Sequence, residues 1–320
     1  MSEVKNTEIL LESGTNEIEI MEFTIDEKCF GINVAKVKEI LQYTKINPMP
    51  NSHPCVEGVF RSREMVITVI NLPKYIGFSE KPVSDRDILI ITNFNKMIMA
   101  FHVHTIEGIQ RISWEDIEKP DITIYGGQEG LATGIAKIDG KLITIIDFEK
   151  IIADISPSSG IKVADVAFMA DRPRNKIPIM IAEDSALLEK LIIDSLTTAG
   201  YSNIIAMTNG KEAWDRLVSI RADKRPLEDK LCCIVTDIEM PQMDGHRLLK
   251  LIKTDPVLKT IPVIIFSSLI SEEMYLKGLE LGADAQISKP EIGSLVGLID
   301  SLVGIETNKH AGPAHVKPAM

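Results

Sequence analysis

Residues with the potential for chemistry follow four apolar runs in the second half of this 320-residue chain. Glu183 and Asp184 follow the first run, Asp237 the second, Ser267 the third and Lys289 the fourth. If these runs are parallel strands, their carboxyl ends meet at one edge of a sheet, where ligands gather. Three carboxylates at one place repel unless a cation joins them, and Mg²⁺ suits a small set of carboxylate oxygens. With a lysine and a hydroxyl beside them, they form a cradle for a phosphoryl group whose acceptor is one carboxylate.

Each of these residues alone has an ordinary structural explanation. An Asp after a strand is most often a cap or turn residue, and Lys289-Pro290 is typical of a loop. The combination on several strand ends is much rarer than any single member, so it favours the phosphoryl site. Asp237 is the central residue, because it is the first acidic group after the run 231–235 and a tight loop through Pro241 and Gly245 follows it.

The segments that must position these residues alternate between two patterns after residue 176. Short runs rich in β-branched residues predict five buried strands, at 177–182, 204–207, 231–236, 261–266 and 285–288. Apolar residues at helical spacing predict five helices, at 186–196, 210–220, 246–252, 272–281 and 293–303. This alternation predicts a doubly wound α/β fold with an open, five-stranded parallel sheet.

The first half of the chain consists of many short strand-like runs broken by Gly and Pro, which predicts a mostly-β barrel or sandwich. Strands are expected at 66–72, 88–92, 97–103, 122–125 and 142–146. Gly58-Val59 before the run 67–72 is echoed by Gly134-Ile135 before the run 143–148, which indicates two similar small barrels. His102 and His104 alternate on one expected strand, and we expect a solvent-facing strand surface there rather than half of a metal site.

Composition and charge narrow the class of protein. A net charge of −11 is untypical of a general nucleic-acid binder. The apolar runs are all far shorter than the ~18 residues of a membrane span. The start of the sequence lacks a signal-peptide pattern, and the adjacent Cys232 and Cys233 suit reduced thiols. We therefore expect a cytoplasmic protein without nucleic-acid partners or membrane insertion. Its expected parts are an arm at 1–16, a β-rich domain at 17–155, a linker at 156–176, an α/β domain at 177–303 and a disordered tail at 304–320.

The acidic site and its strands resemble the receiver domain of two-component signalling, which has a flavodoxin-like fold. The resemblance implies that Asp237 accepts the phosphoryl group and that Glu183, Asp184, Asp237 and the backbone carbonyl of Glu239 bind Mg²⁺. It further implies that Ser267 bonds a phosphoryl oxygen, that Lys289 pairs with the phosphoryl group, and that a cis peptide bond precedes Pro290. One departure is Gln286, which replaces the aromatic residue that often reads out the phosphorylated state.

The β-rich half resembles the CheW-type coupling domain of bacterial chemotaxis, a double SH3-like barrel. The similar pieces include Phe30-Gly31-Ile32, Val56-Glu57-Gly58-Val59 and Gly140-Lys141-Leu142-Ile143-Thr144-Ile145-Ile146-Asp147. Two departures are Arg63-Glu64, where the family usually has Arg-Gly, and Val103-His104, where it has Val-Asp. Both departures concern surfaces used in docking rather than the fold.

A coupling domain followed by a receiver resembles the CheV type of chemotaxis protein. This implies a scaffold that links the cytoplasmic tips of chemoreceptors to a CheA-type histidine kinase within chemoreceptor arrays. Phosphorylation of Asp237 from the kinase phosphohistidine would then serve adaptation or a phosphate sink, without turnover of an outside substrate. Two alternatives stay open at this point, a phosphatase with an aspartyl-phosphate intermediate and a stand-alone response regulator, including one that drives transcription.

Overall fold

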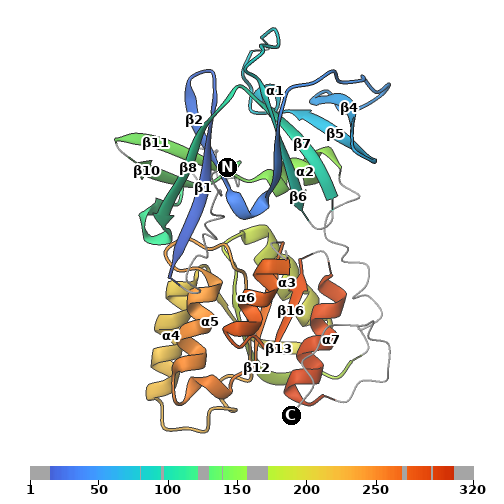
Figure 1. Ribbon diagram of the computed structural model, residues 1–320. Helices are drawn as coiled ribbons and strands as arrows, with labels where there is room; N and C mark the ends of the chain where they lie inside the picture. The colour runs from blue at the N-terminus through green and yellow to red at the C-terminus, as the bar shows by residue number, and fades with distance from the viewer. Residues whose placement is uncertain are drawn as a thin grey trace, which may run out of the picture.

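The structure is a computed structural model that describes residues 15–79, 81–94, 97–121, 130–138, 140–156, 172–268, 272–289 and 291–305. A β-rich part is followed by an α/β part, and the two are stacked on each other (Figure 1). The strand expected at 122–125 and the peptide bond before Pro290 lie outside the described residues, as do most of the expected arm and tail. Both predicted fold classes are confirmed.

The β-rich part contains two sheets, with strand orders β8-β1-β2-β11-β10-β9 and β3-β6-β7-β5-β4. It also contains two short helices, α1 (Leu72–Tyr75) and α2 (Phe148–Ile155), and two 3-10 turns, at Val34–Lys36 and Trp114–Asp116. The strands are β1 (Glu17–Ile25), β2 (Lys28–Asn33), β3 (Val37–Gln42), β4 (Val56–Ser62), β5 (Met65–Asn71), β6 (Ile88–Phe94), β7 (Met97–Val103), β8 (Thr105–Ser113), β9 (Ile117–Glu118), β10 (Ala132–Ile138) and β11 (Lys141–Ile146).

The internal repeat of the sequence is confirmed in the strand pairing. Hairpin β4–β5 corresponds to hairpin β10–β11, and β5 runs parallel to β7 as β11 runs parallel to β2. A helix follows each hairpin, and equivalent residues, Asn71 and Asp147, cap it by accepting a hydrogen bond from the N–H three residues on. Gly58 lies at a register shift with φ 143°, where a Cβ would collide with the carbonyl oxygen of Asn47. The repeated glycine thus marks a bulge that bends the hairpin.

A shared aromatic core joins the two sheets. Phe23 of β1, Phe101 of β7 and Phe148 of α2 are fully buried. The ring centroid of Phe148 lies 4.6 Å from that of Phe101 and 6.1 Å from that of Phe23. Because burying each such side chain stabilises the fold by roughly 2–3 kcal/mol, the two sheets pack as one body.

The expectation for His102 is wrong, because its side chain is buried rather than facing solvent. The residue is 4% exposed, and its Nδ1 and Nε2 lie 2.6 and 3.0 Å from carboxylate oxygens of Glu57 and Asp87. The four last residues of β7 are all buried. Exposed and buried positions therefore do not alternate along β7, which lies between two other strands in its sheet.

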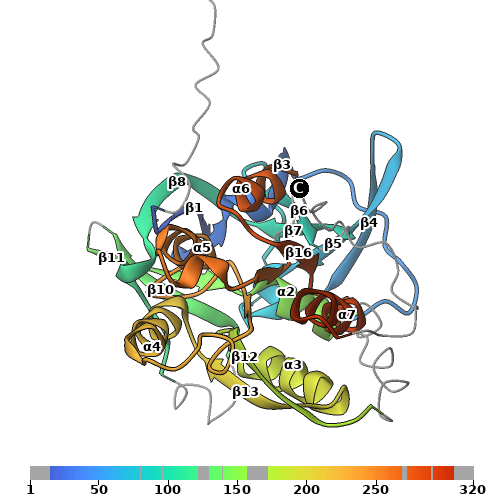
Figure 2. The same ribbon diagram turned by 90° about the horizontal axis from the view of Figure 1, so that it is seen from below.

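The α/β part is a five-stranded sheet with the order β13-β12-β14-β15-β16 and parallel pairing throughout. Helices α3 and α7 cover one face, and α4 and α5 the other (Figure 2). The elements are β12 (Asn175–Ala182), α3 (Ala186–Thr198), β13 (Tyr201–Met207), α4 (Gly210–Ala222), β14 (Cys233–Thr236), α5 (Gly245–Thr254), β15 (Val263–Ser267), α6 (Glu272–Glu280), β16 (Ala285–Ser288) and α7 (Ile292–Val303).

Candidate functional site

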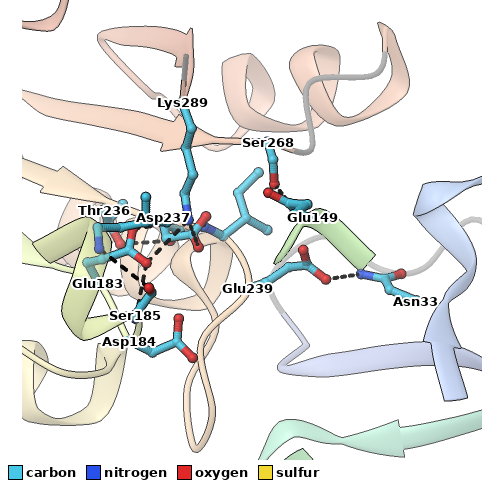
Figure 3. A network of polar contacts seen from close by, with 12 residues as sticks. Asn33, Glu149, Glu183, Asp184, Ser185, Thr236, Asp237, Glu239, Ser268 and Lys289 are labelled. Atoms are coloured by element: carbon cyan, nitrogen blue, oxygen red, sulfur yellow. Dashed lines mark hydrogen bonds and ion pairs between the residues drawn. The ribbon is translucent and has the colours of Figure 1, made fainter. Parts of the chain in front are cut away.

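The predicted site residues come together at the carboxyl edge of the parallel sheet. Glu183 and Asp184 follow β12, Asp237 follows β14, Ser267 ends β15 and Lys289 follows β16. These strands are neighbours in the order β12-β14-β15-β16, so the parallel register brings their ends to one place. This set of five residues is called the acceptor edge, and Figure 3 labels Glu183, Asp184, Asp237 and Lys289.

Lys289 is the cation of the acceptor edge. Its Nζ donates to Asp237 Oδ2 at 2.7 Å and lies 3.1 Å from Glu183 Oε2, and all three residues are buried. Burial alone acts to lower the pKa of Lys289, but the charges of Asp237 and Glu183 outweigh it and hold the pKa well above its ordinary value. The lysine therefore stays charged and is held directly against the Asp237 carboxylate.

Glu183, Asp184 and Asp237 form a crowded acidic triad. Each offers one carboxylate oxygen, and these oxygens lie within 4.8 Å of one another. Burial, followed by the charge of Asp237, raises the pKa of Asp184 to about 7, and burial raises the pKa of Glu183. Glu183 Oε2 is buried, and apart from the ion pair with Lys289 it makes no hydrogen bond among the described residues. A single lysine leaves this triad under-neutralised, and its donor set fits a hard divalent cation such as Mg²⁺.

The loop after Asp237 is shaped by local backbone contacts. Asp237 Oδ1 accepts a hydrogen bond of 2.6 Å from the backbone N–H of Ile238. Gly245 passes so close to the carbonyl oxygen of Asp237 that a Cβ there would collide with it. Asp244 caps α5 by accepting from the N–H of Arg247 at 2.7 Å. The glycine of the sequence motif is thus required for the loop to fold back beside the acceptor.

The other predicted residues have distinct surroundings. Ser267 is fully buried at the end of β15, between β14 and β16. The side chain of Glu239 points away from the triad, and its Oε1 accepts from Asn33 Nδ2 of the β-rich part at 2.8 Å (Figure 3). Gln286 packs against α6, where its Nε2 donates to the carbonyl of Tyr275 at 2.7 Å.

Residues of the β-rich part that were not predicted from the sequence also reach the acceptor edge. Lys36 Nζ lies 2.5 Å from Glu239 Oε2 and 3.0 Å from Glu149 Oε1. Ser268 Oγ donates to Glu149 at 2.5 Å, and Lys119 Nζ donates to the backbone carbonyl of Asp184 at 2.6 Å. On the α/β side of these contacts, Ser268 could be anticipated from the sequence because it adjoins Ser267. The residues of the β-rich part could not, since each lies more than sixty positions from its partner.

Two family profiles match separate parts of the chain. The CheW-like domain matches residues 19–156, and the response regulator receiver domain matches residues 179–300. No helix among the described residues is long and apolar enough to cross a membrane.

Chemotaxis proteins are among the curated relatives. CheV3 of Helicobacter pylori is 31% identical over 287 residues, which cover 86% of this chain and 91% of the relative. CheV1 of the same organism is 26% identical, with 86% and 89% covered. CheW of Thermotoga maritima is 29% identical over 151 residues, with 47% and 98% covered.

Solved structures match each half separately. A scaffolding protein, TtCheW of Thermoanaerobacter tengcongensis, is 25% identical with a TM-score of 0.38, and the match covers 41% of this chain and 89% of that one. A signal receiver domain of a histidine kinase from Syntrophus aciditrophicus is 32% identical with a TM-score of 0.35, and the match covers 43% and 98%.

Proposed function

The chain belongs to the CheV family of chemotaxis coupling proteins, in which a CheW-like domain precedes a receiver domain, and from this premise we propose that phosphorylation of Asp237 regulates its coupling function. The observation that carries the proposal is the contact of 2.7 Å between Lys289 Nζ and Asp237 within the buried acidic triad. A buried carboxylate held by a lysine and crowded by two more carboxylates suits a phosphoryl acceptor.

The reaction proposed is transfer of a phosphoryl group from a phosphohistidine of the kinase. A carboxylate oxygen of Asp237 attacks phosphorus in line, the bond between phosphorus and the histidine nitrogen breaks, and the nitrogen keeps the electron pair. Lys289 stays protonated, and its ion pair shifts from the Asp237 carboxylate to the phosphoryl oxygens. The Ser267 hydroxyl donates a hydrogen bond to one of those oxygens.

The acidic triad is the proposed Mg²⁺ site of this reaction. Glu183, Asp184, Asp237 and the backbone carbonyl of Glu239 would hold the ion. When bound, Mg²⁺ supplies charge that neutralises the phosphoryl oxygens during transfer.

The CheW-like half is the proposed coupling unit. We propose that residues 17–155 dock between the cytoplasmic tips of chemoreceptors and a CheA-type histidine kinase, and that residues 177–303, joined through 156–176, act as their regulatory input. The phosphorylated state would serve adaptation or a phosphate sink. Support comes from the relatives, which include both CheV and stand-alone CheW proteins.

The alternative of an aspartyl-phosphate phosphatase is less well supported. Such an enzyme needs a free general acid two positions after the nucleophile, and Glu239 occupies that position. Its carboxylate is paired with Lys36 and Asn33 and points away from Asp237. The geometry therefore favours a receiver domain that is itself phosphorylated over an enzyme that turns over a phosphorylated substrate.

The test is phosphorylation of the full chain by acetyl phosphate and by the phosphorylated kinase, each with Mg²⁺. We expect Asp237→Asn to abolish the acid-labile label in both reactions, measured by intact-protein mass spectrometry. Asp215→Asn, which changes an exposed aspartate on α4, is the matched control and is expected to label as the wild type does. A label retained in Asp237→Asn contradicts the assignment of the acceptor.

A further inference from the structure

The acceptor edge is in contact with the β-rich domain through the loops after β12, β14 and β15. Ser268 after β15 bonds Glu149, Glu239 after β14 bonds Asn33 and Lys36, and the carbonyl of Asp184 after β12 accepts from Lys119. The four residues of the coupling domain, Asn33, Lys36, Lys119 and Glu149, are called the docking face below. Its members are the last residue of β2, a residue of the 3-10 turn after it, the residue after β9 and a residue of helix α2, so the face is built by the fold rather than by one segment.

Two backbone hydrogen bonds extend the same contact. The N–H of Gln242 donates to the carbonyl of Trp114 at 3.1 Å, and the N–H of Asp244 donates to Asn16 Oδ1 at 2.9 Å. Gln242 and Asn16 both have positive φ, 65° and 68°, which is uncommon for residues other than glycine. The loop after Asp237 is therefore held in shape by the coupling domain as well as by its own backbone.

We propose that the docking face is an interaction surface for the acceptor edge of the same chain, and that docking and a phosphoryl group on Asp237 exclude each other. This inference rests on the proposed phosphorylation of Asp237.

The first reason why docking and phosphorylation should exclude each other is that a phosphoryl group adds both volume and negative charge at the contact. Asp237 is 4% exposed in the docked arrangement, and the donor must approach it in line from the loop side. A phosphoryl group places about two negative charges outside the carboxylate and takes Lys289 as its partner. Burial acts to raise the pKa of Glu149 of the docking face, but the charges of Lys36 and then of Lys289 outweigh it and lower the pKa, and burial together with Glu149 raises the pKa of Asp147. The phosphoryl group thus draws the charge of Lys289 away from Glu149 and Asp147, and its own negative charge repels these two residues.

The second reason is the geometry of Ser268. Its Oγ donates to Glu149 at 2.5 Å, and it directly follows Ser267. If the Ser267 hydroxyl moves to a phosphoryl oxygen, the adjoining Ser268 moves with it and leaves Glu149. Since coupling between two sites is reciprocal, the docking contacts must in turn disfavour the phosphorylated state. Because Asp237 is 4% exposed when docked, the docked population should also slow its phosphorylation.

The test uses the full chain and Lys36→Glu, which reverses the cation between Glu149 and Glu239. Lys38→Glu makes the same charge change at an exposed position on β3 and is the matched control. Lys119→Ala is a second variant, because its exposed side chain is not needed for folding. We expect Lys36→Glu to be labelled by acetyl phosphate at least about fivefold faster than Lys38→Glu, the lower end of typical couplings between sites. Lys119→Ala is expected to change in the same direction.

Hydrogen exchange gives a second readout that needs no variant of the docking face. The amides of Gln242 and Asp244 report docking directly, since both donate to the coupling domain. We expect Mg²⁺ with beryllofluoride, a phosphoryl mimic, to speed their exchange, as well as exchange at residues 33–36, in the wild type and not in Asp237→Asn.

The outcomes separate this inference from the proposed function. Normal labelling of Asp237, with equal rates in Lys36→Glu and Lys38→Glu and unchanged exchange at residues 33–36, overturns the docking antagonism and leaves the phosphorylation intact. A label that is absent from the wild type but present in Lys36→Glu supports a strongly closed docked state. A label that is absent from both overturns the proposed function itself.

Discussion

Two buried clusters, one in each half of the molecule, place a cationic side chain among carboxylates. In the receiver half Lys289 faces Asp237 and Glu183. In the coupling half His102 lies between Glu57 and Asp87. Both clusters would attract attention as candidate sites on burial and charge alone, yet their internal balance differs.

The His102 cluster is closed by its own hydrogen bonds. Each ring nitrogen faces a carboxylate oxygen, so the imidazole is expected to carry both protons. Glu57 also accepts from the Tyr43 hydroxyl and from Asn71 Nδ2, each at 2.7 Å. This arrangement has the properties of a structural cluster, because its hydrogen-bond donors and acceptors are matched, with one imidazole held between two carboxylates.

The acceptor edge has the opposite character. Three carboxylates crowd one lysine, and Glu183 Oε2 is buried and, apart from the ion pair with Lys289, makes no hydrogen bond among the described residues. The cluster lies on loops at strand ends rather than inside a sheet. A buried polar cluster with unmatched charge needs an additional ligand, whereas a matched one needs none. This difference can be tested by disturbing each cluster in turn.

The largest effect is expected from His102→Leu. The substitution leaves Glu57 and Asp87 without their buried cation, which should lower the free energy of unfolding by roughly 3–5 kcal/mol. Denaturant unfolding, with amide exchange of residues 65–103 to locate the change, measures it. His104→Leu is the matched control, because that histidine is more exposed and accepts one hydrogen bond from the N–H of Asp26. A loss in His102→Leu no larger than in the control would contradict a structural role.

The meeting of the five residues at one edge could be predicted from the sequence because of a property of parallel sheets. Strand ends that are far apart in the chain share one edge, so polar residues after successive apolar runs could be brought together without knowledge of distances. The strand at 204–207 was predicted too short, since β13 begins at Tyr201. Tyr201 is fully buried, and its hydroxyl donates to Asp300 at 2.6 Å, a contact that no local pattern announces.

The contacts between domains and the His102 cluster could not be predicted. Lys36 meets Glu239 only because two separately folded surfaces fit, and surface pairing leaves no period in the sequence. His102 was predicted to face solvent because an alternating strand pattern assumes one exposed face. Its partners Glu57 and Asp87 lie 45 and 15 positions away in the sequence, so the pattern could not reveal them. Composition and spacing report what a strand can do, but not which distant side chains will meet it.

The next effect in size is stabilisation by Mg²⁺, which should act on the receiver cluster alone. At a concentration of one hundred times its dissociation constant, the ion should raise the free energy of unfolding by about 2.7 kcal/mol. The pKa of Asp184 is raised to about 7, so protons should compete with the ion, and its affinity should fall as the pH is lowered through 7. Thermal unfolding with and without Mg²⁺, at pH 6 and 8, measures both effects.

The variant Asp184→Asn should lose the stabilisation by Mg²⁺, and Asp194→Asn, which changes an exposed aspartate on α3, should keep it. Equal stabilisation of both variants would argue against the triad as the metal site.

The smallest effect is the pH dependence of the matched cluster. Burial acts to lower the pKa of His102, but Glu57 and Asp87 outweigh it and raise the pKa above its ordinary value of 6.5. The imidazole therefore binds its proton more tightly in the folded state than in the unfolded state. The resulting stabilisation is complete below pH 6.5 and is lost as the pH rises through the folded-state pKa. It amounts to about 1.4 kcal/mol for each tenfold difference in proton affinity between the two states.

Unfolding of the wild type between pH 6 and 9 should therefore show a decline that His102→Leu lacks. The difference in decline between the wild type and His102→Leu should be the same with and without Mg²⁺, because the ion is expected to bind the acidic triad and not the histidine cluster. An NMR titration of the imidazole gives the folded-state pKa independently. If the imidazole titrates below 6.5, the two carboxylates do not outweigh burial, and the contrast between a matched and an unmatched cluster fails at its matched end.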